Sequence, residues 1–322
     1  MDVFFLTTQQ MLMMFTLIVI GFILAKLKIL PDNADKTMSR LETYLFAPAL
    51  YFYNQLTKCT VDTFKENIRL MAVGVAILAC AMVLAFFLSR LFVPNAKGNA
   101  EKEYLRNIYN YAMTFSNFGF LGNFLALGIF GQDGLFKYSL FTFFISIICH
   151  SWGLFLLIPK KEGASLWKNL ANGFLKPPTV AMLLGMAGGL LGLSKYIPQF
   201  FITACNNASD CMGPVSMVLA GFVIGGYSIK NLLSDKKVYI ATFLRLIAIP
   251  ALMLVVLKAI GVSEEIMVWT LIAFASPLGL NTIVFPAAYG GQTKTGASMA
   301  LISHVLSVVT IPVMYYLFII LL

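Results

Sequence analysis

The chain has 322 residues, of which 59% are hydrophobic and only 11% are charged. A soluble domain averages about 25% charged residues, so this composition excludes a protein that faces water on all sides. The net charge of +9 could indicate nucleic-acid binding, but the basic residues lie in short loops between apolar runs, where membrane topology requires them. The sequence therefore predicts an all-α membrane protein and no nucleic-acid partner.

Apolar runs of about 20 residues, the length that crosses ~30 Å of hydrocarbon, recur along the chain. The loops on one side of these runs carry most of the lysines and arginines. The positive-inside rule places those loops in the cytoplasm and both termini outside the cell, in a multi-pass protein of the plasma membrane with the lipid bilayer as a partner. Ten transmembrane helices are predicted, at residues 9–28, 38–56, 68–90, 107–130, 134–158, 177–194, 205–228, 237–260, 265–289 and 296–320.

The longest linker, residues 161–176, divides the chain into residues 1–160 and 177–322, with five predicted spans in each part. Its apolar residues recur at roughly helical spacing among lysines, so we expect a cytoplasmic amphipathic segment on the membrane surface. The halves are weakly similar, since SNFG (116–119) matches SPLG (276–279). Because five is odd, the second half enters the membrane inverted, which is typical of secondary transporters.

The stretch SPLGLNTIVFPAAYGG (276–291) places helix-breaking residues inside the ninth predicted span. Pro277 lacks an amide hydrogen, and Gly279 adds backbone freedom. The related stretch SNFG lies inside the fourth span. Freed backbone groups are costly in lipid unless protein or a wet cavity covers them. Two such breaks predict a polar cavity at the bilayer midplane, and the alternative is a proline kink with a packing role.

The half-helix ends at this cavity would present peptide dipoles, and their positive ends suit a carboxylate. Arg245 in span 8 could bind a carboxylate in bidentate fashion, or it could equally extend its charge to the inner membrane interface. The predicted substrate site consists of Ser116, Asn117, Gly119, Gly122, Asn123, Ser276, Pro277, Gly279, Asn281, Thr282 and Arg245.

An ionisable residue within a span is a functional hypothesis by default. His150 and His304 each follow an interrupted span. They could carry a coupling proton, or they could be neutral histidines bonded to a neighbouring helix. Asp210 could bind a cation or cap a helix start. Glu42, near Arg40 at the start of span 2, is interpreted as solvated.

The small-residue runs GMAGGLLG (185–192) and GFVIG (221–225) permit close helix contact, either within the fold or, for span 7, at a dimer seam. The five cysteines have no metal spacing. No H-E-x-x-H, G-x-S-x-G or P-loop pattern occurs. We therefore expect no enzyme activity, no metal and no cofactor apart from a coupling proton or sodium ion.

Three stretches resemble motifs of the auxin efflux carrier family, within the larger bile/arsenite/riboflavin transporter group. They are SNFGFLGNFLALGIFG (116–131), SPLGLNTIVFPAAYGG with its continuation to SVVTIP (307–312), and KLKILPDNADKTMSRLETYLFAPAL (26–50). The resemblance implies ten spans in two inverted five-helix repeats, with broken helices 4 and 9 crossing. It also implies a scaffold of spans 1, 2, 6 and 7, a transport domain of spans 3–5 and 8–10 that moves like an elevator, and a homodimer formed through the scaffold.

The resemblance further implies an organic anion as substrate, since bacterial members are mostly described as permeases for carboxylates such as malate or malonate. The family usually has proline soon after the G-F-L-G of span 4, and this chain has Phe124 there. Span 4 is therefore expected to break on Gly119 and Gly122 alone. The prediction is a secondary transporter, and the alternatives are a membrane metabolite sensor that does not transport and an intramembrane enzyme.

Overall fold

The computed structural model describes residues 2–158, 174–289 and 291–321. These residues fold into helices, with one isolated β-bridge between Ser116 and Leu278. The expected all-α membrane protein is confirmed, whereas the count of ten spans stays a prediction, because several expected spans are short or interrupted. Within the described residues, six helical segments are long and apolar enough to cross a bilayer: Phe4–Lys26, Val61–Phe92, Phe118–Leu157, Gln199–Gly225, Lys236–Ala259 and Lys294–Leu321.

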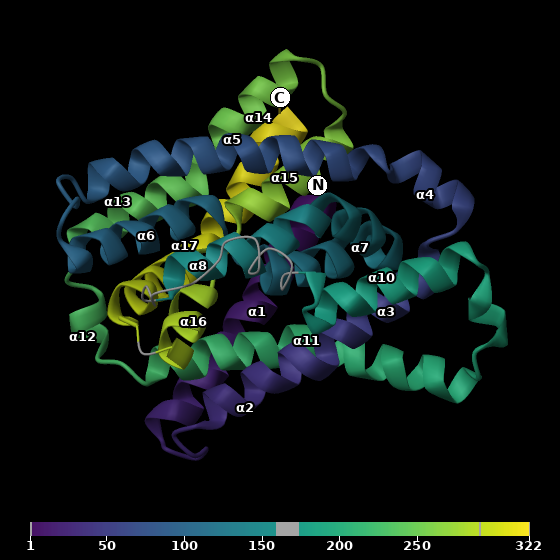
Figure 1. Ribbon diagram of the computed structural model, residues 1–322, viewed down its shortest axis with the longest axis horizontal. Helices are drawn as coiled ribbons and strands as arrows, with labels where there is room; N and C mark the ends of the chain where they lie inside the picture. Colours follow the sequence, from purple (N-terminus) through teal and green to yellow (C-terminus); the bar gives the residue numbers. More distant parts are fainter. Residues whose placement is uncertain (1, 159–173, 290, 322) are drawn as a thin grey trace.

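The first helices of the chain run from Asp2 to Thr114, where the first interruption of the helical backbone begins. α5 crosses the upper part of the view and packs on α6, while α2 lies at the bottom of the view (Figure 1). The elements are α1 (Asp2–Lys26), α2 (Ala34–Leu41), the π-helical η1 (Glu42–Phe46), α3 (Ala47–Lys58), α4 (Val61–Asn67), α5 (Arg69–Phe92) and α6 (Ala100–Thr114).

A π-helical turn, η2 (Phe118–Gly122), follows the first interruption and leads into α7 (Asn123–Ile148). Gly131 kinks α7 with a φ of 67° and a ψ of −163°, a conformation that favours glycine. The kink falls where the sequence predicts the boundary between spans 4 and 5. The first half ends with η3 (Cys149–Gly153) and α8 (Leu154–Leu157).

The second half begins with α10 (Pro177–Leu190), η4 (Leu193–Tyr196) and α11 (Gln199–Gly225). Most of the predicted surface linker, residues 161–173, lies outside the described residues. The remaining elements are α12 (Ile229–Leu232), α13 (Lys236–Phe243), η5 (Leu244–Ala248), α14 (Ile249–Ala259), α15 (Glu264–Ala275), α16 (Asn281–Tyr289), α17 (Lys294–Tyr315) and η6 (Tyr316–Leu321).

Helices from the two halves pack backbone to backbone: α1 contacts α11, and α3 contacts α10 (Figure 1). A Cβ atom added at Gly221 would lie 1.8 Å from the carbonyl oxygen of Ile18. A Cβ atom at Gly185 would lie 2.7 Å from the carbonyl oxygen of Phe52. Only glycine permits such contact, so both small-residue runs pack helices within the fold, as predicted.

Candidate functional site

In the part of the chain that the structure describes, each half contains a non-helical segment within an apolar run. In the first half, α6 ends at Thr114 and η2 begins at Phe118. In the second half, α15 ends at Ala275 and α16 begins at Asn281. The second break contains Pro277, whose ring cannot continue a helix.

The first break lies before Gly119 and Gly122, not on them as the sequence suggested. Both glycines lie inside η2 and are helical. Gly122 is required for packing, because a Cβ atom there would lie 2.1 Å from the hydroxyl oxygen of Tyr138. Phe124, at the usual proline position, lies in α7 beyond the break. The interruption therefore needs neither a proline nor these two glycines.

The two non-helical segments pair with each other across the halves. Ser116 and Leu278 form an antiparallel bridge. The Asn117 backbone N–H donates a hydrogen bond of 2.7 Å to the Pro277 carbonyl oxygen. The Leu278 N–H donates to the Ser303 hydroxyl at 3.0 Å. These bonds replace helical partners that the break removes, which is what a buried backbone requires within a membrane.

Arg245, in η5, contacts the end of α6 just before the first non-helical segment. Its side chain is fully buried, and its Nη1 donates to the carbonyl oxygen of Met113 at 3.3 Å, in the last turn of α6. Its Cζ lies 5.3 Å from the centroid of the Phe274 ring. A cation is favourable at the negative C-terminal end of a helix. Arg245 therefore does not extend to the membrane interface, and it stabilises the end of α6 instead of lining the cavity described next.

A cavity of about 70 Å³ lies beside the paired segments. The N-terminal residues of η2 and the first residue of α16 line it, whereas residues from the last turns of α6 and α15 do not. The lining residues are Thr43, Ala47, Tyr51, Ser116, Asn117, Phe118, Gly119, Phe120, Ser146, His150, Lys176, Pro178, Met212 and Asn281. Two positive helix ends thus face one cavity.

Asn117 and Asn281 present amide groups at this cavity and are held by buried partners. Asn281 Nδ2 donates to the hydroxyl oxygen of Tyr111 at 3.0 Å. Asn117 Nδ2 lies 3.3 Å from His304 Nε2. Since His304 Nδ1 lies 2.8 Å from the carbonyl oxygen of Ala300, which can only accept, Nδ1 carries the hydrogen and Nε2 accepts from Asn117. His304 therefore orients Asn117 from outside the cavity lining.

His150 lines the cavity itself. Its Nδ1 lies 2.8 Å from the carbonyl oxygen of Ser146, so the same reasoning places the hydrogen on Nδ1 and leaves Nε2 as an acceptor. Its ring contacts the ring of Phe285, with 6.0 Å between centroids. Of the two predicted histidines, only His150 is positioned to meet a bound solute.

Several predicted site residues lie elsewhere. Asn123 donates to the hydroxyl of Tyr51 at 2.7 Å and lines a separate cavity of about 130 Å³ together with Asp210. The Thr282 hydroxyl donates to the Gly279 carbonyl, and the Ser276 hydroxyl donates to the carbonyl of Ile272. Thr282 and Ser276 therefore close the local turns of the second interruption.

The structure contradicts the interpretation of Asp210 as a helix cap and the interpretation of Glu42 as a solvated residue. Asp210 lies inside α11, which begins at Gln199, so it does not cap the helix. It is exposed, and the amide of Asn206 lies 3.5 Å from its carboxylate. Glu42 is not solvated, because its side chain is completely buried. The earlier start of α11 decides the first outcome, and helix packing decides the second.

Lys176 and Tyr51 line the cavity but were not predicted as site residues. Lys176 is the residue before Pro177, where α10 begins. A lysine at the end of the basic linker next to an apolar span could have indicated this position. Tyr51 follows Pro48 in span 2, and no local pattern distinguishes it from a packing residue.

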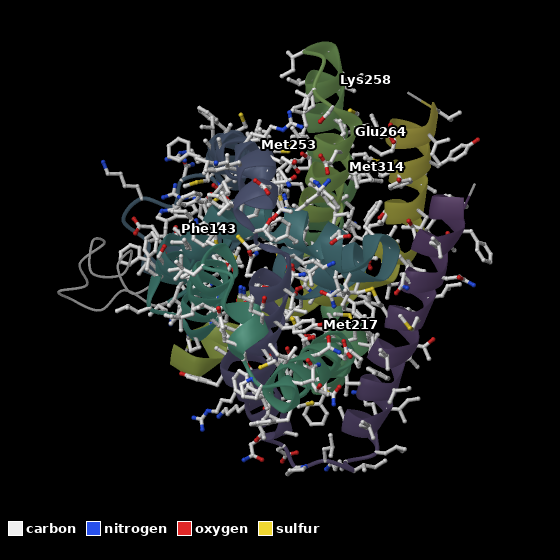
Figure 2. The ribbon with its side chains drawn as sticks, turned by 90° about the vertical axis from the view of Figure 1, so that its right-hand side faces the viewer. Phe143, Met217, Met253, Lys258, Glu264 and Met314 are labelled. Carbon is white, nitrogen blue, oxygen red and sulfur yellow. The ribbon has the colours of Figure 1, made fainter. Side chains whose placement is uncertain are left out.

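A larger cavity, about 450 Å³, is an open groove away from the interruptions. It is lined by residues around the Lys137–Glu265 ion pair and by Glu264. Figure 2 places Glu264 in the upper part of the molecule and Met217 of α11 in the lower part. We assign the site to the smaller cavity, because the interrupted backbones and helix ends converge there.

Interrupted helices that meet beside a cavity in an all-helical membrane protein are typical of solute transporters. The chain belongs to the membrane transport protein family, whose profile matches residues 6–169 and 163–315, and this confirms the resemblance to the auxin efflux carrier family.

Relatives of known name are also transporters. An uncharacterized transporter of Methanocaldococcus jannaschii is 24% identical over 93% of this chain and 95% of its own length. A protein of Rhizobium meliloti, provisionally named a malonate transporter, is 24% identical over 96% of this chain and 95% of its own length. An uncharacterized transporter of Methanothermobacter thermautotrophicus is 24% identical over 81% of this chain and 80% of its own length. The protein is a multi-span membrane transporter.

Proposed function

We propose that this transporter is a secondary carrier of a small organic anion in the plasma membrane. One observation carries the proposal: the N-terminal ends of η2 and α16 both line the cavity, and the opposite helix ends do not. Each helix N-terminus has unpaired N–H groups and a partial charge of about +0.5. Such ends bind anions without a dedicated basic residue.

The remaining lining groups suit a carboxylate. Lys176 adds a positive charge at the edge of the cavity, and Asn117 and Asn281 add amide groups. A small carboxylate such as malate or malonate would use the helix ends for one carboxylate and Lys176 for a second. The name of the Rhizobium relative supports this substrate class.

The cavity lies between two groups of helices, which supports an elevator mechanism. Tyr51 of α3 and Met212 of α11 line one wall, and Asn117 and Asn281 line the other. The first wall belongs to the proposed scaffold of spans 1, 2, 6 and 7, and the second to the proposed transport domain. Movement of the transport domain would carry the anion across the membrane. We further propose a homodimer through the scaffold, both termini outside the cell, and coupling to a proton or sodium ion.

Binding and uptake of carboxylates test this function. Purified protein is screened by thermal shift against mono- and dicarboxylates, with and without sodium, and a stabilising compound is then tested for uptake into proteoliposomes. In Asn281→Ala, the loss of one amide donor to a charged ligand should weaken uptake roughly tenfold or more. Expression should be unchanged.

Asn231→Ala serves as the matched control, because Asn231 is exposed on α12, outside the cavity lining. Unchanged uptake by the Asn281 variant would remove Asn281 from the site. Binding of a carboxylate without uptake would contradict transport and identify a metabolite sensor.

A further inference from the structure

Glu42 is a buried carboxyl group that the proposed anion site does not use. It is the first residue of the π-helical segment η1, and its side chain is 0% exposed. π-Helical turns are rare and often occur at functional sites. Across the interface, Ser216 of α11 is also 0% exposed.

Neither oxygen of the Glu42 carboxyl group has a hydrogen-bond partner among the described residues, and neither does the Ser216 hydroxyl. Ser216 lies close enough to influence the carboxyl group, but the two are not in hydrogen-bond geometry. Burial of an ionised carboxylate without a partner costs many kcal/mol, so such a group is normally neutralised.

No basic side chain neutralises Glu42 among the described residues. Lys36 and Arg40 on α2 are exposed, and Lys58 on α3 pairs with Asp133 at 2.7 Å. α10 carries no charged side chain. No group of three acidic, histidine or cysteine ligands gathers for a metal ion in the described part of the chain. The other titratable groups on helices packed against η1 are Asp35 of α2, Tyr51 and Tyr53 of α3, and Cys205, Asp210 and Cys211 of α11.

Glu42 and Ser216 each have a residue close by on the same helix that lines the anion cavity. Thr43, the residue after Glu42, lines the cavity. Met212, one helical turn before Ser216, lines it too. A movement of these lining residues would therefore also move the helix segments that carry Glu42 and Ser216.

We propose that Glu42 is a proton-binding site between spans 2 and 7, with the Ser216 hydroxyl as its nearby polar group, and that its proton is coupled to transport. The coupling rests on the proposed function, but the proton site does not. In this state the carboxyl group holds the proton and is neutral. When the cavity wall moves and water enters, the carboxyl group releases the proton and becomes a carboxylate.

Infrared spectroscopy tests the proton site independently of transport. A pH-difference spectrum of the purified protein should contain the carbonyl stretch of a protonated carboxylic acid. Glu42→Gln, which matches the neutral acid in shape, should lose that band. Glu66→Gln should keep it, because Glu66 is exposed on α4. Absence of the band from the wild-type protein, or its persistence in Glu42→Gln, would overturn the proton site.

Ser216→Ala provides a second variant that leaves the carboxyl group in place. Its band should remain and shift in frequency, because the neighbouring hydroxyl is gone. An unshifted band would overturn the role of Ser216.

The coupling is tested by uptake in proteoliposomes with an imposed pH gradient. The gradient should stimulate uptake by the wild-type protein and the Glu66 variant, and it should not stimulate uptake by Glu42→Gln. Equal stimulation of Glu42→Gln, or its loss only in a His150→Gln, His304→Gln double variant, would overturn the coupling. Absence of uptake in every variant, with the infrared band intact, would contradict the proposed transport function instead.

Discussion

Among the described residues, Arg245 and Glu42 are the two fully buried side chains of opposite charge that no ion pair accounts for. Arg245 is always charged. Its charge is stabilised by the carbonyl of Met113 and the face of the Phe274 ring. A carboxyl group can instead lose its charge by taking up a proton. Arg245 thus keeps its charge although its Nε and Nη2 atoms have no hydrogen-bond partner in the part of the chain that the structure describes, whereas the proposed proton would neutralise Glu42.

Replacement of Arg245 by Met should destabilise the protein, because it removes the donor to the Met113 carbonyl and the cation at the end of α6. We expect a loss of about 1–3 kcal/mol, the cost of an unsatisfied buried acceptor. A lower midpoint of thermal unfolding of Arg245→Met in detergent, compared with the wild-type protein, would show this loss of stability. A raised KM for uptake with an unchanged midpoint would contradict this role and show that Arg245 binds the substrate.

At the scale of elements, the interrupted helices are held by contacts between halves. Each extended segment depends on the other for backbone partners, as the bond from Asn117 to the Pro277 carbonyl shows. The first break therefore forms without a proline of its own. The proposed scaffold contains a different contact between the halves, the direct approach of the α1 and α11 backbones at Gly221.

Gly221→Val should force α1 away from α11, because its Cβ would overlap the carbonyl oxygen of Ile18. Overpacking of this kind costs roughly 1–3 kcal/mol, so the midpoint of thermal unfolding should fall. Gly226→Ala is the control, since a Cβ atom there would lie 3.3 Å from its nearest neighbour, the carbonyl oxygen of Val223. Equal midpoints for both variants would show that the α1–α11 contact is looser than described.

The sequence predicted the second break more accurately than the first. Pro277 breaks the helix through its own ring, so the sequence around it is enough to predict the break. The first break depends on Leu278 and Pro277, more than 150 residues away, so Gly119 and Gly122 were a reasonable but wrong choice. Asn117 and Asn281 were predicted at the site because they lie in or beside the helix-breaking stretches. Lys176 lies far from both stretches in the sequence, so neither stretch indicated it.

For the whole molecule, the proposed elevator requires the transport domain to slide along the scaffold. Phe124 of α7 fills the space beside Gly213 of α11, where a Cβ atom would lie 1.9 Å from the ring. Phe124 and Gly213 line the cavity of about 130 Å³, which shares Phe120 and Met212 with the lining of the anion cavity. Phe124 therefore marks the contact that must break if the domain moves.

A cross-link between α7 and α11 should stop transport. We expect a Phe124→Cys, Gly213→Cys pair, in a background with the native cysteines replaced by serine, to lose uptake on oxidation and regain it on reduction. Oxidation of a Gln55→Cys, Gly185→Cys pair should leave uptake unchanged, because both positions belong to the proposed scaffold and their Cβ atoms would lie 3.0 Å apart. Full uptake by an oxidised α7–α11 pair would contradict the elevator motion.

The sequence by itself determined the membrane class, the apolar helices and the two regions that could not remain helical, because hydrophobic runs and a proline act over a few neighbouring residues. Only the tertiary structure decided that the two breaks pair, that Arg245 stabilises the end of α6, and that Glu42 is sealed between helices. These outcomes depend on contacts between residues far apart in the chain. A local pattern does not record which distant group will supply a hydrogen bond, a charge or a covering surface.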